Sequence, residues 1–288
     1  MRDPLGVLYK ALVNGGSIDI KPPYLDEAIE YARLNKVLLQ FLRASRIEGE
    51  SRRAEEGKLA DTIRNVEEVN HKLKGLNYAF YKLVKPVVYA PSDIDILIGI
   101  EDLEEAAYRL RDLGFRTTVV EPYCITMSRL ATIVDLYVHP TLGGMIYMDG
   151  QELLTHMKLA KYHSVEVPCL EKYAEALVAA THALYKERLY TLNDYITIKK
   201  WMSNETMMLA EIQKCKPSLD LAVKLNDLIE RGIIKTPHKL SMTTWIKLFG
   251  QKIIEDPLSR VTCKNLIGIL MSSHGIEKIK SKMIRRTY

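Results

Sequence analysis

The feature that most constrains this chain is a pair of aspartates within a short apolar run, Asp93-Ile94-Asp95-Ile96-Leu97-Ile98. Its β-branched content predicts a strand, in which side chains at positions i and i+2 point to the same face. Asp93 and Asp95 should therefore project together, while Ile94 and Ile96 project to the opposite, buried face. Two neighbouring carboxylates repel each other and resist burial, so they need compensating charge. A hard cation such as Mg²⁺, which prefers oxygen ligands, would supply it.

A third aspartate lies in a second apolar run, Ile133-Val134-Asp135-Leu136. If the two strands are neighbours, Asp93, Asp95 and Asp135 converge on one patch of the sheet. Such a patch can hold two metal ions about 3.5–4 Å apart, the arrangement used for in-line displacement at phosphorus. We therefore predict a site for Mg²⁺, or Mn²⁺, at these three residues. The alternatives are solvated acids at a strand edge and the D-x-D motif of a glycosyltransferase, which would need a larger nucleotide-sugar domain.

Composition narrows the class of protein. The chain has 288 residues, 47% hydrophobic and 27% charged, so it can form two or three compact units. Its net charge of +5 is a mild excess, below the strong basicity of a dedicated nucleic-acid-binding protein. No run approaches the ~20 apolar residues of a membrane span, and the start Met1-Arg2-Asp3-Pro4 does not fit a signal peptide. We expect a cytoplasmic protein without membrane contact.

Three other groups of residues say less about function: the cysteines, the histidines and the basic residues near the C-terminus. The four cysteines form no C-x-x-C pair, so we expect buried thiols. The histidines lack the H-E-x-x-H spacing of a zinc hydrolase. The basic run is either a solvated tail or a contact with an RNA backbone. It consists of Lys278, Lys280, Lys282, Arg285 and Arg286.

The chain divides into three regions by pattern. We predict a helical N-terminal region over 1–68, an α/β core with a mixed sheet over 69–150, and a helical C-terminal domain over 151–288. Within the core we expect an interrupted helix over 70–84, a β-prone run at 87–89, and an amphipathic helix over 103–113 that Gly114 ends. Strands are expected at 93–99, 116–120 and 131–138. Helices are also expected over 25–41, 173–185, 190–202, 206–214 and 219–231, and an exposed helix or connection over 44–68.

The core resembles the DNA polymerase β-type nucleotidyltransferase superfamily, in its branch of uncharacterised, minimal and toxin-type nucleotidyltransferases. The motifs that carry the resemblance are Leu73-Lys74-Gly75, Ser92-Asp93-Ile94-Asp95-Ile96-Leu97-Ile98, Leu110 to Phe115, and Val134-Asp135-Leu136, within residues 69–202. The resemblance implies a minimal nucleotidyltransferase fold. It makes Asp93 and Asp95 the paired metal ligands and Asp135 the third catalytic carboxylate.

The resemblance also implies a nucleotide site. Lys74 and Gly75 would form the phosphate-binding turn, with Ser92 beside the acids, and His182 and Asp194 match a helical signature near the nucleotide. Lys186, four residues after His182, shares its helix face and could contact phosphate.

Each of these residues also has a purely structural interpretation. Gly75 could end a helix, Lys74 could be a surface lysine, His182 could lie at the core edge, and Asp194 could be a surface acid. Three tyrosines could stack on a base or pack between helices, and a histidine after the third-acid strand could support that acid. These are Tyr185, Tyr190, Tyr195 and His139.

The implied function is transfer of a nucleoside monophosphate from an NTP to an acceptor hydroxyl, with release of pyrophosphate. The acceptor could be an RNA or tRNA 3′ end, a protein side chain or a small molecule. The alternative is a module that binds nucleotide or RNA without turnover. Two departures from the family pattern favour this alternative. Lys74-Gly75-Leu76 lacks the serine with which the family binds phosphate, and Tyr89-Ala90-Pro91 occupies the place before the acids where the family often has an arginine. NTP preference and oligomeric state are left open.

Overall fold

The computed structural model describes Leu8, Leu12 and residues 24–270. It is a mixed α/β structure built on a seven-stranded sheet with the order β3-β4-β5-β2-β1-β9-β8. Strand β2 is parallel to β5 and β1 is parallel to β9, while the other neighbouring pairs are antiparallel. The mixed sheet expected from the sequence is therefore confirmed.

The N-terminal region and the core alternate helices with strands. Helices α2 and α3 form a hairpin, and the long α4 leads into the sheet. The elements are α2 (Tyr24–Leu34), α3 (Leu38–Ala44), α4 (Glu50–Leu73), β1 (Tyr78–Phe80), β2 (Ile94–Ile98), a 3₁₀ turn (Ile100–Asp102), α5 (Leu103–Asp112), β3 (Arg116–Glu121), β4 (Cys124–Arg129), β5 (Thr132–Tyr137), β6 (Thr141–Leu142) and β7 (Met145–Ile146).

The following part of the chain completes the sheet and then becomes helical. Its elements are α6 (Gly150–Leu154), β8 (Met157–Tyr162), β9 (Val165–Leu170), α7 (Lys172–Thr181), a π-helical turn (His182–Glu187), β10 (Leu189–Tyr190), α8 (Leu192–Trp201), α9 (Asn204–Ile212), α10 (Lys216–Glu230), β11 (His238–Lys239), α11 (Met242–Glu255) and α12 (Pro257–Leu270). Among residues 24–270, no helix has an apolar stretch that could cross a bilayer.

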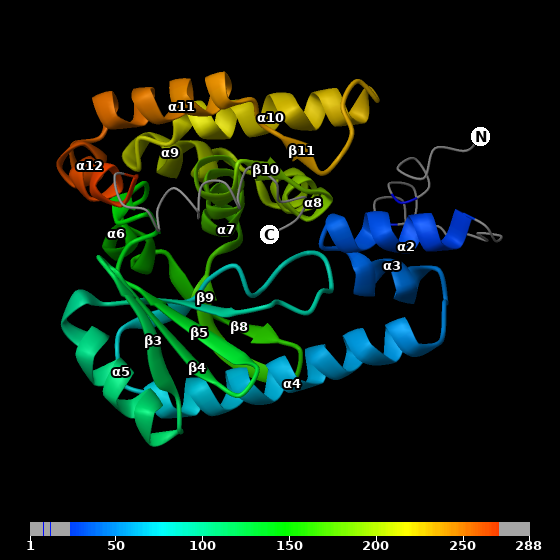
Figure 1. Cartoon of the computed structure of the whole chain (residues 1–288), viewed down its shortest axis with the longest axis horizontal. Helices are drawn as coiled ribbons and strands as arrows, with labels where there is room; N and C mark the ends of the chain where they lie inside the picture. Colours follow the sequence, from blue (N-terminus) through cyan, green and yellow to red (C-terminus); the bar gives the residue numbers. More distant parts are fainter. Residues whose placement is uncertain (1–7, 9–11, 13–23, 271–288) are drawn as a thin grey trace.

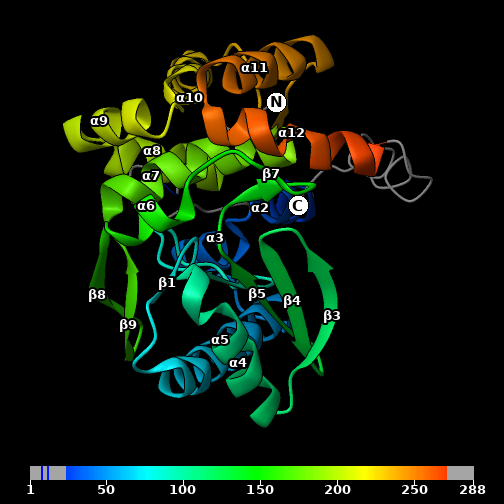
Figure 2. The same ribbon diagram turned by 90° about the vertical axis from the view of Figure 1, so that its left-hand side faces the viewer.

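The sheet lies between two helical layers, with α4 and α5 on one side and the C-terminal helices on the other (Figures 1 and 2). Because side chains alternate between the two faces of a strand, the residues of the sheet divide between two core clusters, one on each face. Ile94, Ile96 and Leu136 pack in a cluster with residues of α4 and α5. Leu97 and Tyr137 point the other way and belong to a larger cluster with α2, α3 and the C-terminal helices. The prediction that Ile94 and Ile96 face away from the acids is confirmed.

Two expectations for residues 70–89 are wrong. The helix predicted over 70–84 ends at Leu73, and Tyr78–Phe80 forms strand β1, which lies between β2 and β9 in the sheet. All three residues of β1 are buried because both faces of the strand are covered: Tyr78 and Phe80 pack in one core cluster and Ala79 in the other. The sequence therefore lacks the polar–apolar alternation of a half-exposed strand. The β-prone residues 87–89 form a loop, in which Val88 donates its backbone N–H to the Gln40 side chain (3.1 Å).

Other elements follow the sequence prediction or extend it. Strands β2, β3 and β5 and helices α5 and α7–α10 lie where the pattern places them, with Gly114 at φ +84° after α5. The helical pattern over 25–41 is divided by a turn into α2 and α3, which the sequence analysis did not predict. The sequence pattern missed β4 and the β8–β9 hairpin, which adds two strands to the sheet within a stretch expected to be largely helical. Of the four cysteines, three are buried and Cys263 is half-exposed.

Candidate metal and nucleotide site

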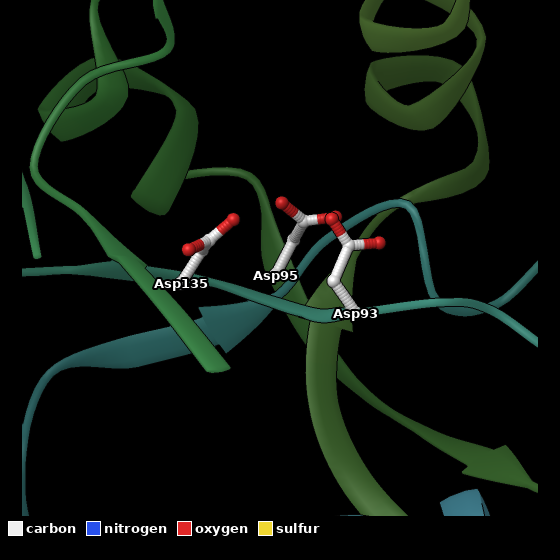
Figure 3. A group of neighbouring side chains, drawn as sticks. All are labelled: Asp93, Asp95 and Asp135. Carbon is white, nitrogen blue, oxygen red and sulfur yellow. The ribbon is translucent and has the colours of Figure 1, made fainter. Parts of the chain in front are cut away.

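The three predicted aspartates converge on the face of the sheet that looks toward the C-terminal helices (Figure 3). Asp95 on β2 lies directly beside Asp135 on the parallel strand β5, and Asp93 immediately precedes β2. One oxygen from each carboxylate lies within 4.8 Å of the others. Asp95 is 6% exposed and Asp135 9%. Three oxygen donors around a common point form a group that could bind a divalent cation.

Burial strongly opposes ionisation of the Asp95 carboxyl group. Burial raises the pKa of Asp95 to about 7; Lys82 opposes that shift, whereas Asp93 and Asp135 add to it. The Lys82 Nζ lies 2.8 Å from Asp95 Oδ1. For Asp93, burial also opposes ionisation, but Lys82 and a hydrogen bond from Ser92 (3.0 Å) hold the pKa below its usual value. The donor set fits a cation, because three carboxylates each place an oxygen around a common point and Asp95 is buried beside the other two.

Asp135 is held by hydrogen bonds from two strands. Thr126, its cross-strand partner on β4, donates to Oδ1 at 2.5 Å, and Tyr137 donates to Oδ2 at 3.2 Å. The Tyr137 hydroxyl in turn accepts from Lys186 Nζ at 2.9 Å. These hydrogen bonds link Asp135 through Tyr137 to the Lys186 ammonium group on the π-helical turn. The orientation of Asp135 therefore depends on both the sheet and the C-terminal helices.

Asp93 and Asp95 line one wall of a cavity of about 240 Å³ between the sheet and the helices, whereas Asp135 is not among its lining residues. Cations from three separate segments line it as well. The lining residues are Lys36, Lys82, Lys85, Tyr89, Pro91, Ser92, Asp93, Asp95, Ala179, His182, Lys186, Glu187, Asn193 and Asp194.

Four of the six predicted nucleotide-binding residues line this cavity, namely Ser92, His182, Lys186 and Asp194. Asp194 also completes the capping box of α8 by accepting from the Thr191 backbone (2.9 Å) and hydroxyl (2.6 Å). It therefore has a structural role whether or not it binds a ligand. The π-helical turn places His182 and Lys186 together, and such turns occur often at functional sites.

Lys74 and Gly75 do not join the site. Both are exposed in the turn between α4 and β1, and Gly75 has φ +91°, as expected for a glycine that follows a helix end. Because β1 is antiparallel to β2, with Tyr78 opposite Ile98, this turn lies at the end of β1 remote from the acids. The prediction of a phosphate-binding turn at Lys74-Gly75 is corrected: the loop that meets the acids is the one after β1, which begins at Lys82.

The aromatic candidates are packing residues. Tyr185, Tyr190 and Tyr195 are fully buried in the large core cluster, and none lines the cavity. His139 accepts from the Gly150 backbone N–H at 3.0 Å and lies 3.3 Å from Asp149, so it anchors the start of α6. The basic run from Lys278 lies outside the described residues.

The sequence analysis missed the lysines that face the acids. Lys82 has φ +61°, an unfavourable conformation for lysine. Its backbone is held from both sides: its N–H donates to Glu175 Oε1 at 2.6 Å, and its carbonyl accepts from the Tyr89 hydroxyl. Lys85 pairs with the other Glu175 oxygen at 3.2 Å. Recognising Tyr78–Phe80 as a strand next to the acids would have drawn attention to Lys82.

Lys36 also lines the cavity and was missed by the sequence analysis; it comes from the turn between α2 and α3. Burial lowers the pKa of Lys36, against the attraction of Asp194 and Asp93.

In comparisons with known proteins, no family model and no curated protein matches the chain. The functional interpretation therefore depends on the geometry of the site.

Proposed function

We propose that the protein is a metal-dependent nucleotidyltransferase that moves a nucleoside monophosphate from an NTP to an acceptor hydroxyl. Its α/β part would be a minimal nucleotidyltransferase core. The observation that carries the proposal is the placement of Asp95 beside Asp135, with Asp93 two residues before Asp95 and one oxygen of each within 4.8 Å of the others.

The three carboxylates would hold Mg²⁺ or Mn²⁺. A cation bound there would draw charge from the α-phosphate and lower the pKa of the acceptor hydroxyl. The acceptor oxygen attacks the α-phosphorus, the bond from that phosphorus to the β-bridging oxygen breaks, and pyrophosphate leaves. Asp135 is suited to accept the hydroxyl proton, because Thr126 and Tyr137 fix its orientation.

The lysines of the cavity suit the phosphates of the NTP. Lys82 and Lys186 approach the Tyr137 ring at 5.7 and 5.0 Å from its centroid, on the side of the sheet that carries the acids. Positive charge beside a metal site stabilises the charge that spreads over phosphate and pyrophosphate oxygens during transfer. The acceptor class we favour is an RNA or tRNA 3′ end, with a protein side chain as the second class, and the reaction is expected in the cytoplasm.

The test is incubation of the pure protein and Mg²⁺ with each α-labelled NTP, first with total RNA and then with a protein extract. Label should pass to one of the two acceptors and pyrophosphate should be released. Asp93→Asn and Asp135→Asn should each lower transfer about a hundred- to a thousandfold, because they remove charge that the transition state needs while conserving shape. Asp112→Asn, at an exposed site on α5, is the matched control and should keep wild-type activity. Full activity in either site variant would reject the mechanism.

One observation favours a second function, a nucleotide-binding module without turnover. Lys82 already neutralises Asp95 at 2.8 Å, so the fold can tolerate the buried acid without a cation. Such a module would bind an NTP in calorimetry but release no pyrophosphate with any acceptor, and its nucleotide affinity would not depend on Mg²⁺.

A further inference from the structure

The turn between α2 and α3 has an unusual backbone. Asn35 and Lys36 follow α2, and Lys36 has φ +56°, at a position where helices usually end in glycine. Its N–H donates to Arg33 at 3.1 Å, and the next N–H, of Val37, returns to Ala32 at 3.0 Å. A lysine in this conformation is strained, and strain of this kind is retained where the surrounding structure enforces it.

Asn35 enforces the conformation by joining the turn to the start of α8. Asn35 is fully buried, its Oδ1 accepts from the Leu192 N–H at 2.9 Å, and its Nδ2 donates to the Thr236 carbonyl at 3.2 Å. The Asn193 side chain donates to the Lys36 carbonyl at 3.0 Å. These bonds connect segments about 157 and 201 residues apart in the chain, and they fix the point from which the Lys36 side chain leaves.

The Lys36 side chain lines the same cavity as Asp93, Asp95 and Lys82. The apolar residues of α2 and α3 pack in one core cluster with the C-terminal helices, so the hairpin is an integral wall of the site. The Lys36 ammonium group carries its positive charge near Asp93 and Asp194 in this cavity, and ammonium groups bind phosphate oxygens through charge-assisted hydrogen bonds.

We propose that the α2–α3 hairpin is a working part of the nucleotide site, in which Lys36 binds the polyphosphate of the incoming NTP. The inference rests on the proposed function and deepens it. It assigns substrate binding to a segment outside residues 69–202, the part of the chain that carries the resemblance to nucleotidyltransferases. The hairpin completes the site, so the α/β core alone would bind the NTP poorly.

The chain contains a matched control for Lys36. Lys214 also follows a helix, α9, with φ +51°. Its N–H donates to Glu211 at 3.2 Å, and the next N–H, of Cys215, returns to Ala210 at 2.7 Å. Lys214 is exposed and does not line the cavity, so it shares the backbone geometry of Lys36 without the proposed contact.

The experiment compares Lys36→Gly and Lys36→Met with Lys214→Gly and Lys214→Met in the full chain. Binding of each NTP and of inorganic triphosphate is measured by calorimetry with Mg²⁺ present, and the melting temperature of every variant is recorded. Both Lys36 variants should bind about tenfold more weakly or worse, because they lose a charge-assisted contact. Lys36→Gly should melt at or above the wild-type temperature, since glycine adopts positive φ without strain. The Lys214 variants should bind as the wild type does.

Three results would overturn the inference. Wild-type affinity in both Lys36 variants would reject it while leaving the proposed function in place. A lower melting temperature for Lys36→Gly with unchanged affinity would show that Lys36 only balances charge. If the wild-type protein binds neither the NTPs nor triphosphate, the nucleotidyltransferase proposal fails together with the inference.

Discussion

Asp95 combines burial with charged neighbours of both signs. Its carboxylate lies beside Asp135 and Asp93, and Lys82 is the ion-pair partner at 2.8 Å. A group whose pKa is raised to about 7 holds its proton through the range in which ordinary aspartates have lost theirs. Metal ligands must be deprotonated, so a proton on Asp95 competes directly with a cation.

We expect the affinity for Mn²⁺ to depend on pH through Asp95. Below about pH 7 a cation must displace one proton, so affinity should rise about tenfold per pH unit, and it should level off above pH 7. Calorimetry or electron paramagnetic resonance between about pH 5.5 and 8.5 measures this directly. An affinity that stays constant from about pH 5.5 to 7 would show that Asp95 is already ionised without metal.

At the scale of elements, α7 organises the loop that follows β1. Glu175 of α7 is 1% exposed and accepts the Lys82 N–H with one oxygen while the other pairs with Lys85. Lys82 could not keep its φ of +61° without such support, because this conformation is unfavourable for residues other than glycine. One buried carboxylate on a helix thereby positions the lysine that meets Asp95.

Glu175→Ala should therefore destabilise the protein strongly. Removing one partner of a buried ion pair leaves the other uncompensated, which typically costs about 3–5 kcal/mol. Urea unfolding should show a correspondingly lower midpoint with an unchanged slope. Glu211→Ala, which removes an exposed pair with Lys216, is the control and should leave the midpoint near the wild-type value. Near-wild-type stability of Glu175→Ala would mean that the loop is held by other contacts.

At the scale of the whole molecule, the site lies where three parts of the chain meet. Strand β2 and the residue before it contribute Asp95 and Asp93, the α2–α3 hairpin contributes Lys36, and the turn after α7 contributes His182 and Lys186. The core clusters show the same division, since the hairpin and the C-terminal helices share one cluster while α4 and α5 share the other with the far face of the sheet. A ligand in the cavity would bind all three parts at once, and only in the folded state.

Mg²⁺ with an NTP should accordingly raise the melting temperature. At a ligand concentration about 100 times the dissociation constant, linkage supplies about 2.7 kcal/mol. For a chain of this size, that corresponds to roughly 5 °C. Differential scanning calorimetry of the wild type and Asp93→Asn tests the point, because the variant should lose most of the shift. An equal shift in both proteins would place the ligand elsewhere.

The sequence by itself predicted the features that depend on local periodicity. Alternation around Asp93 and Asp95 identified strand β2 and the face on which its acids lie, and the apolar run at Asp135 identified β5. Alternation in a strand follows from backbone geometry, so neighbouring residues suffice to reveal it. The short strand β1 did not show it, because its residues are buried on both faces and resemble part of the preceding helix.

The partners of those acids were decided only by the tertiary structure. Lys82 and Lys36 lie 13 and 59 residues before Asp95, and no spacing rule relates them to it. Lys82 faces the acids because β1 pairs antiparallel with β2, and Lys36 does so because Asn35 docks on α8. Acids on one strand are related by the geometry of a few consecutive bonds. Compensating charge can come from any segment that folding brings near, and the packing of the whole chain determines which segment that is.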